Sequence, residues 1–291
     1  MTAGAGDVPP MLDRKRMMKT VLGRIARISG AYERAFGSTM LITAFHRVSR
    51  RLPEDSLTCS AAKFERFCRF FSRYARVVPL AEQVAACREG KGMSGTVSIT
   101  FDDGYLDNFE VAAPILRSLQ LPATFFITTG FIGSQLTAPW DVALVQQPGW
   151  MSWDNVRSLA AQGFEIGAHT DTHIDMGSVD AETVRLELEV SKQKIERELG
   201  ISVQLFAYPF GNRENISDRS RQLVRDLGFA CCVSSYGGVN MPGTSPYELK
   251  RLPIAEWFAT PDQFGFEFVR GLWQLHRAGL DSDSSARGTH H

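Results

Sequence analysis

Short apolar runs alternate with longer amphipathic stretches along most of the chain, from about residue 39 onward. The apolar runs are rich in β-branched and aromatic side chains, and they are short enough to favour β-strands over helices. They predict strands over residues 39–46, 75–80, 96–101, 123–128, 164–169, 203–209 and 229–234.

Apolar residues recur at helical spacing between these runs, which predicts helices over residues 61–74, 108–120, 152–163, 180–200 and 217–228. Strands separated by helices imply parallel crossovers, so an open doubly wound sheet and a closed β/α barrel both fit the order. No G-x-G-x-x-G or Walker-type loop follows a predicted strand. The main reason to prefer a dinucleotide-binding sheet is therefore missing.

The two ends of the chain differ from its middle. Residues 11–36 carry Met, Val, Leu and Ile at helical spacing among Arg and Lys. This pattern fits a helix packed on the protein's own body, which we favour, or a helix on an anionic membrane surface. A further helix is predicted over residues 260–279, and the last residues are polar and aperiodic. The predicted domains are an N-terminal basic amphipathic helix and tail (1–38), a main domain (39–278) and a disordered tail (279–291).

Composition and charge exclude some classes of function. The chain has 32 Lys plus Arg and 32 Asp plus Glu, so no net charge attracts nucleic acid. Its five cysteines form no C-x-x-C pair, and a chain of 291 residues needs no disulfide framework, which fits a reducing compartment. The N-terminus lacks the uninterrupted apolar core of a secretion signal. We therefore expect a cytoplasmic protein without nucleic-acid partners.

Two predicted strands deliver polar residues to the edge where α/β active sites form. Asp102 and Asp103 follow residues 96–101, and adjacent side chains on an extended chain point in opposite directions, so they can take different tasks. A bare Asp pair is more often a turn or a helix cap. His169 and His173 follow residues 164–169, and their spacing suits a metal site, although two loop histidines can also be solvated bystanders.

A third strand end reads "AYPFG", residues 207–211. Pro209 and Gly211 allow a sharp turn that could present Tyr208 and Phe210 to the same cavity, while an ordinary strand exit is the plainer interpretation. Residues 130–152 form the longest irregular stretch, and such a segment at a strand end often walls a substrate groove.

The motifs "TFDDG", "HTDTH" and "AYPFG", in this order and each after an apolar strand, resemble the polysaccharide deacetylase family. This family is also called the NodB-homology or carbohydrate esterase family 4 enzymes, and the resemblance covers roughly residues 39–258. It implies a distorted β/α barrel with about seven parallel strands. It also implies zinc, or another divalent transition metal, held by Asp103, His169 and His173, with Asp102 as the base.

In this resemblance, Tyr208, Pro209 and Phe210 correspond to the loop that shapes the groove, and the Phe210 N–H would stabilise the oxyanion. Asp171 is then expected to be a loop hydrogen-bonder and not a ligand. The chain departs from the family twice. It has no late strand-end histidine to serve as general acid, for which we expect His46, and Ala207 stands where many members carry an Arg. Arg251 is the predicted substitute beside Asp102.

Both departures match the branch that acts on poly-N-acetylglucosamine and related exopolysaccharides. The predicted enzyme removes N-acetyl groups from N-acetylhexosamine units of a bacterial polysaccharide or its lipid-linked precursor. A cytoplasmic location favours the precursor, and the N-terminal helix would make peripheral contact with the inner membrane face. A deacylase of a small amide or amino sugar, and an inactive carbohydrate-binding module, remain as alternatives.

Overall fold

The computed structural model describes residues 14–286, and these divide into two compact units. The larger unit runs from residue 36 to residue 257, and the smaller unit joins residues 14–35 to residues 258–286. The predicted boundary after the main domain therefore differs from the observed one. Residues 258–278 group with the N-terminal helix because the first and last helices pack together.

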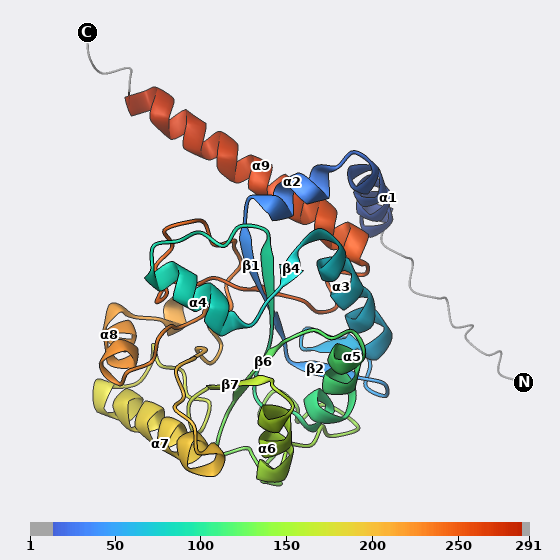
Figure 1. Ribbon diagram of the computed structural model, residues 1–291. Coiled ribbons are helices and arrows are strands. Elements are labelled where there is room, and N and C mark those ends of the chain that lie inside the picture. The colour runs from blue at the N-terminus through green and yellow to red at the C-terminus, as the bar shows by residue number, and fades with distance from the viewer. Residues whose placement is uncertain (1–13, 287–291) are drawn as a thin grey trace, which may run out of the picture. The chain divides into compact units, whose positions relative to one another are not determined.

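A mainly parallel sheet forms the centre of the larger unit (Figure 1). Its strand order is β7-β6-β5-β1-β8, and β4 also pairs with β5. Every residue of β1 and β5 is buried, as expected of parallel strands that are covered on both faces. The bounds are β1 Met40–Phe45, β4 Arg76–Val77, β5 Thr96–Phe101, β6 Thr124–Ile127, β7 Glu165–Ala168 and β8 Leu252–Pro253. A separate parallel pair is formed by β2 (Arg47–Ser49) and β3 (Thr58–Ser60).

Isolated parallel bridges continue the sheet beyond β7. Ala168 pairs with Phe206, Ala207 pairs with Val233, and Val233 pairs with Leu249. The last of these segments leads into β8, which pairs with β1. The parallel pairings thus run in a circuit, with a regular ladder on one side and single bridges on the other. The predicted α/β class is confirmed, and this circuit agrees with a distorted barrel of parallel strands.

Two predicted strands, over residues 203–209 and 229–234, are reduced to these bridges. The first leaves the sheet at Pro209, which has no N–H to donate. In the second, the N–H of Cys232 turns away to the carbonyl of Pro246. Both segments nevertheless keep their places in the circuit.

The helices of the larger unit lie around the strands (Figure 1). Their bounds are α3 Ala61–Tyr74, α4 Leu80–Arg88, α5 Ala113–Ser118, α6 Trp153–Ala161, α7 Ala181–Leu199 and α8 Asp218–Asp226, with a π-helical turn at Asn108–Ala112 and a 3-10 turn at Arg213–Asn215. The predicted strand over residues 75–80 is shortened to β4, and the helix α4, which follows it, was not predicted. It begins where the Glu165 carboxylate accepts hydrogen bonds from the Leu80 and Ala81 N–H groups at 2.8 and 3.1 Å. This cap comes from β7 and is invisible in the local sequence.

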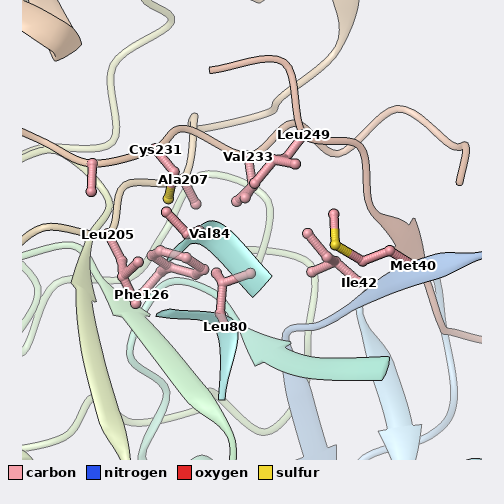
Figure 2. Packing of buried hydrophobic residues seen from close by; sticks show 11 residues of the cluster. Met40, Ile42, Leu80, Val84, Phe126, Leu205, Ala207, Cys231, Val233 and Leu249 are labelled. Carbon is pink, nitrogen blue, oxygen red and sulfur yellow. The ribbon is translucent and has the colours of Figure 1, made fainter. Parts of the chain in front are cut away.

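A buried apolar cluster joins the two sides of the circuit (Figure 2). It contains Ile42 of β1, Phe126 of β6, and Val233 and Leu249 of the bridged segments. Met40, Leu80, Val84, Leu205, Ala207, Ala230 and Cys231 complete it. The irregular segments and the regular ladder therefore share one core.

The smaller unit contains α1 (Arg14–Ile28), α2 (Ala31–Gly37, whose last two residues belong to the larger unit) and α9 (Pro261–Ala286). The single predicted N-terminal helix is broken at Gly30, whose φ of 72° is left-handed. The predicted tail from residue 279 is helical up to Ala286, and residues 1–13 and 287–291 lie outside the described residues. None of the helices described is both long and apolar enough for a membrane crossing.

Candidate active site

A cavity of about 310 Å³ opens at the carboxyl edge of the parallel strands. Its lining brings together the predicted strand-end residues from β1, β5 and β7, together with aromatic side chains: His46, Asp102, Asp103, His169, His173, Trp140, Phe210 and Trp257. A larger cavity of about 450 Å³ is lined by Arg50, Arg51 and Gln147 among others, but by none of the predicted site residues. The smaller cavity is therefore the candidate site.

Asp103, His169 and His173 form the one group among the described residues whose side-chain geometry could hold a metal ion. The Asp103 Oδ1 atom lies 3.4 Å from His169 Nε2 and 3.3 Å from His173 Nε2. Ligands roughly 2.1 Å from a tetrahedral ion would lie roughly 3.4 Å apart, so these separations suit such an ion. Oδ1 of Asp103 is buried without a hydrogen-bond partner, as expected of an atom placed for a metal.

The hydrogen bond of His169 leaves one ring nitrogen available. Its Nδ1 atom lies 2.8 Å from the carbonyl oxygen of Ala207. With Nδ1 as the donor to that carbonyl, Nε2 keeps a lone pair on the side of Asp103 and is free to bind a metal ion. The bridged segment at residue 207 thus orients His169, a candidate metal ligand that follows β7.

Asp102 lies on the other side of the strand end and is paired with Arg251. The two guanidinium nitrogens Nη1 and Nη2 donate to Oδ1 and Oδ2 of Asp102, each at 2.7 Å. Both side chains are buried, with 0% and 1% of their side-chain areas exposed. Burial by itself raises the pKa of the Asp102 carboxyl, but Arg251 outweighs it, and the pKa lies below its usual value. Asp102 is therefore ionised at neutral pH.

Every N–H of the Arg251 guanidinium has an acceptor. Besides Asp102, it donates to the Ser234 carbonyl at 2.7 Å and to the Thr100 and Ser235 hydroxyl oxygens at 3.0 Å each. Five donors in a fixed fork meet five acceptors, which Lys could not reproduce. The guanidinium carbon also lies 5.5 Å from the centroid of Phe126 in the core cluster.

His46 follows β1 and faces the same carboxylate. Its Nε2 atom lies 3.9 Å from Asp102 Oδ2, and 20% of its side chain is exposed. Burial lowers the pKa of His46 below its usual value, and the carboxylates of Asp103 and Asp102 offset this only in part. His46 therefore lines the cavity as a mainly neutral imidazole at neutral pH.

Left-handed backbone clusters at this edge of the sheet. Five non-glycine residues in the described part of the chain have positive φ, and four of them, Asp103, Thr170, His173 and Phe210, lie on the loops around the cavity. Such conformations are costly for residues with a Cβ atom and concentrate at functional sites. The left-handed residues thus include two candidate metal ligands, Asp103 and His173, and Phe210 of the "AYPFG" loop.

Gly211 allows this loop to approach Ser235, a hydrogen-bond partner of Arg251. Its φ is +65°, and a Cβ atom there would lie 2.5 Å from the Ser235 backbone nitrogen. The Ser235 hydroxyl in turn accepts a hydrogen bond from Arg251. A larger residue at position 211 would push Ser235 away and so disturb one of the five hydrogen bonds of the Arg251 guanidinium.

Tyr208 does not line the cavity, contrary to the sequence-based expectation. Its N–H still donates to the Val233 carbonyl at 3.1 Å, so it belongs to the extended segment. Successive side chains on such a segment point to opposite faces, and Ala207 occupies the core face. Tyr208 therefore faces a different cavity, lined by Arg221 and Tyr247 among others. Pro209 is absent from the lining as well, and only Phe210, which is 47% exposed, reaches the candidate site.

Asp171 forms hydrogen bonds that hold its own loop, and it is not part of the candidate metal trio. Its Oδ1 atom accepts hydrogen bonds from Lys194 Nζ at 2.7 Å and from the Thr129 hydroxyl. The carboxylate of Glu187 on α7 accepts from the N–H groups of Asp171 and Thr172, each at 2.8 Å. The partners come from other elements, so this loop is tied to α7 and to the end of β6.

A buried polar network that the sequence did not reveal fixes the aromatic wall. Trp140 Nε1 donates to the Tyr105 hydroxyl oxygen at 2.7 Å, and that hydroxyl donates to Asp141 Oδ2 at 2.8 Å. Asp141 Oδ1 accepts from the buried Arg47. The ring centroids of Trp140 and His173 lie 4.6 Å apart. The predicted wall segment 130–152 thus contributes one indole, which the network holds against a metal-ligand candidate.

Comparison with known proteins agrees with this geometry. The family model for polysaccharide deacetylase matches residues 89–232. The chain is 21% identical over 216 residues to the Bacillus subtilis protein YxkH, whose name places it among polysaccharide deacetylases, covering 74% of this chain and 71% of that one. It is 24% identical over 207 residues to a poly-β-1,6-N-acetyl-D-glucosamine N-deacetylase of Staphylococcus aureus, covering 68% of each.

The chain belongs to the polysaccharide deacetylase family. The fold agrees, because the Streptococcus pyogenes deacetylase PplD superimposes with a TM-score of 0.66 at 20% identity, covering 78% of this chain and 96% of that one. Polysaccharide deacetylases are hydrolases, so the predicted enzyme class is confirmed at the level of the family. The family is generally metal-dependent, and the trio of Asp103, His169 and His173 fits that property.

Proposed function

We propose that this polysaccharide deacetylase is a metal-dependent N-deacetylase of N-acetylhexosamine units. One observation carries the proposal: Asp102, buried and kept ionised by Arg251, adjoins the trio of Asp103, His169 and His173 in one cavity. A base beside a set of metal ligands is the arrangement that metal-assisted amide hydrolysis uses. An inactive binding module would need neither.

The chain's own residues suffice for the proton transfers. Hydrolysis adds the oxygen of water to the acetyl carbon, breaks the carbon–nitrogen bond and moves one proton to the leaving amine. We assign to Asp102 the removal of a proton from the attacking water, because its carboxylate is ionised and, unlike that of Asp103, is not one of the three candidate metal ligands. His46, 3.9 Å away, is the proposed carrier of a proton to the amine, since a neutral imidazole can accept and then donate one.

A divalent metal, which we propose to be zinc, would be held by Asp103, His169 and His173 and would supply Lewis-acid polarisation of the acetyl carbonyl. The Phe210 N–H is the proposed donor to the developing oxyanion. It makes no hydrogen bond within the described residues and belongs to a loop that lines the cavity.

The proposed substrate is an N-acetylglucosamine polymer or its lipid-linked precursor. Aromatic side chains at the cavity, Trp140, Phe210 and Trp257, offer apolar faces on which a sugar ring can pack. The Staphylococcus aureus relative carries the polymer in its name. We also propose a cytoplasmic location, which favours the precursor and is supported by five free cysteines.

The proposal is tested by measuring acetate release from N-acetylglucosamine oligomers of increasing length. Asp102→Asn removes the base while leaving the ligand trio, and it should abolish release. Asp154→Asn, at an exposed position on α6, is the matched control and should leave the rate unchanged. Full activity in Asp102→Asn would overturn the assignment of the base. Release from the monomer alone would favour a deacylase of small amino sugars.

A further inference from the structure

The first helix has an apolar face that nothing in the described residues covers. Met17, Met18, Val21, Ile25 and Ile28 of α1 are between 52% and 85% exposed. Their spacing of three to four residues places most of them along one side of the helix. A row of large apolar side chains in water on one face of a single helix is a typical interaction surface.

The opposite face of α1 already packs on α9 within the smaller unit. Gly23 is buried there, and a Cβ atom at this position would lie 2.0 Å from the backbone oxygen of Asp262. Lys19 Nζ forms an ion pair with Glu267 Oε1 at 2.9 Å. The helix therefore has its place on the protein's own body, and its exposed apolar side chains are not needed for that packing.

The charge of α1 indicates the partner. The helix has six basic residues and no acidic one. Four of them, Arg14, Lys15, Arg24 and Arg27, are exposed. Arg24 and Arg27 each lie 3.8 Å from the Asp262 carboxylate of α9, which offsets one of these positive charges. Two copies of this chain joined through their α1 faces would bring like charges together, which disfavours a symmetric dimer. A negatively charged surface would attract the same residues.

We propose that α1 binds an anionic lipid bilayer, with its apolar face among the acyl chains and its Arg and Lys side chains at acidic headgroups. The helix would lie in the plane of the membrane and would not cross it. This inference goes beyond the proposed deacetylation and uses no residue of the catalytic cavity. If the substrate is lipid-linked, the same contact would bring the enzyme to it.

The test uses the full chain and vesicle co-sedimentation. The native protein should bind vesicles of phosphatidylcholine with phosphatidylglycerol and should not bind phosphatidylcholine alone. Replacing Val21 and Ile25 together (Val21→Gln, Ile25→Gln) keeps the charge and should weaken binding by about ten-fold or more. Leu186→Gln, on α7, removes an apolar side chain that is 59% exposed and should bind as the native protein does.

A charge variant tests the second half of the inference. Arg14→Gln combined with Arg24→Gln should weaken binding by roughly 25-fold, at about five-fold for each cation. Raising the salt to about 1 M should weaken native binding, because the screening length falls to about 3 Å. Equal binding to neutral vesicles, or equal binding by the apolar double variant, would overturn the inference. So would a native dimer that the apolar variant dissociates.

Catalysis and membrane binding can fail separately in these experiments. Asp102→Asn should bind vesicles as the native protein does, and the α1 variants should deacetylate soluble oligomers at the native rate. Loss of vesicle binding in Asp102→Asn would contradict a surface confined to α1. An inactive native protein that still binds anionic vesicles would reject the proposed function and leave this inference standing.

Discussion

At the scale of single residues, Arg251 decides the state of the proposed base. A buried carboxylate on its own would hold a proton, because burial raises its pKa. The bidentate pair with Arg251 reverses this effect at Asp102. In family members with an Arg at the position of Ala207, that Arg would supply the positive charge beside the base. In this chain Arg251 supplies it from another segment.

Arg251→Lys should move the acid limb of the kcat/KM profile to higher pH. Lys cannot donate to both carboxylate oxygens in the same geometry, so the pKa of Asp102 should rise toward the value that burial favours. The measurement is a pH–rate profile with an acetylated oligomer. Arg157→Lys, which changes an exposed ion pair on α6, is the control and should leave the profile unchanged. An unshifted acid limb in Arg251→Lys would contradict the electrostatic role.

The stability of Arg251→Met provides a second readout. An uncompensated buried carboxylate should destabilise the fold by about 3–5 kcal/mol near neutral pH. In the native protein the pKa of Asp102 is depressed, so its ionised carboxylate stabilises the fold. This contribution is complete at any pH well above the unfolded-state pKa of about 3.9. This contribution is lost as the pH falls through the lower folded-state pKa. The difference between native and Arg251→Met should therefore shrink in acid.

At the scale of elements, strand ends explain why so much of the site could be predicted. Parallel strands align their carboxyl ends, so β5 and β7 bring Asp103 next to His169 although 66 positions separate them in the sequence. The direction of Tyr208 could not be predicted in the same way. It depends on how far the extended segment continues, which the Val233 carbonyl decides from elsewhere in the chain.

The network behind Trp140 was beyond sequence reasoning for a similar reason. Its hydrogen bonds join Tyr105 to Asp141 and Asp141 to Arg47, over separations of 36 and 94 residues. None of these residues stands in a motif. Only the presence of a Trp-Asp pair in the irregular segment 130–152 could have singled them out, and such a pair has no specific meaning by itself.

Tyr105→Phe should separate substrate binding from chemistry. It removes the hydroxyl between Trp140 and Asp141 but keeps the ring, whose centroid lies 4.5 Å from that of Trp150. The partly buried Trp140 Nε1 then lacks its acceptor, at a cost of about 1–3 kcal/mol in stability. KM should rise several-fold, while kcat and metal content change little.

The control is Tyr247→Phe, which removes a hydroxyl bonded to the Phe229 carbonyl at 2.9 Å. Tyr247 lines the other cavity, so KM should be unchanged. A fall in kcat with constant KM in Tyr105→Phe would show that the network acts on the reacting groups and not on sugar positioning.

At the scale of the whole molecule, the metal trio exists only after folding. Its ligands come from the ends of β5 and β7, and the Ala207 carbonyl that orients His169 belongs to a third segment. An ion bound by the native state and not by the unfolded chain raises the stability of the native state. The metal should therefore contribute to the fold of the larger unit as well as to its chemistry.

Removal of the metal by a chelator should abolish acetate release and lower the midpoint of thermal unfolding, and added zinc should restore both. At a free zinc concentration about 100 times its Kd, the gain is about 2.7 kcal/mol, or a shift on the order of 5–10 °C. His173→Ala should lose this response, because His173 supplies one of the nitrogens closest to Asp103 Oδ1. His276→Ala, an exposed position on α9, should keep it. The metal site would be rejected if zinc did not change the midpoint of thermal unfolding of the native protein and the chelator did not lower its activity.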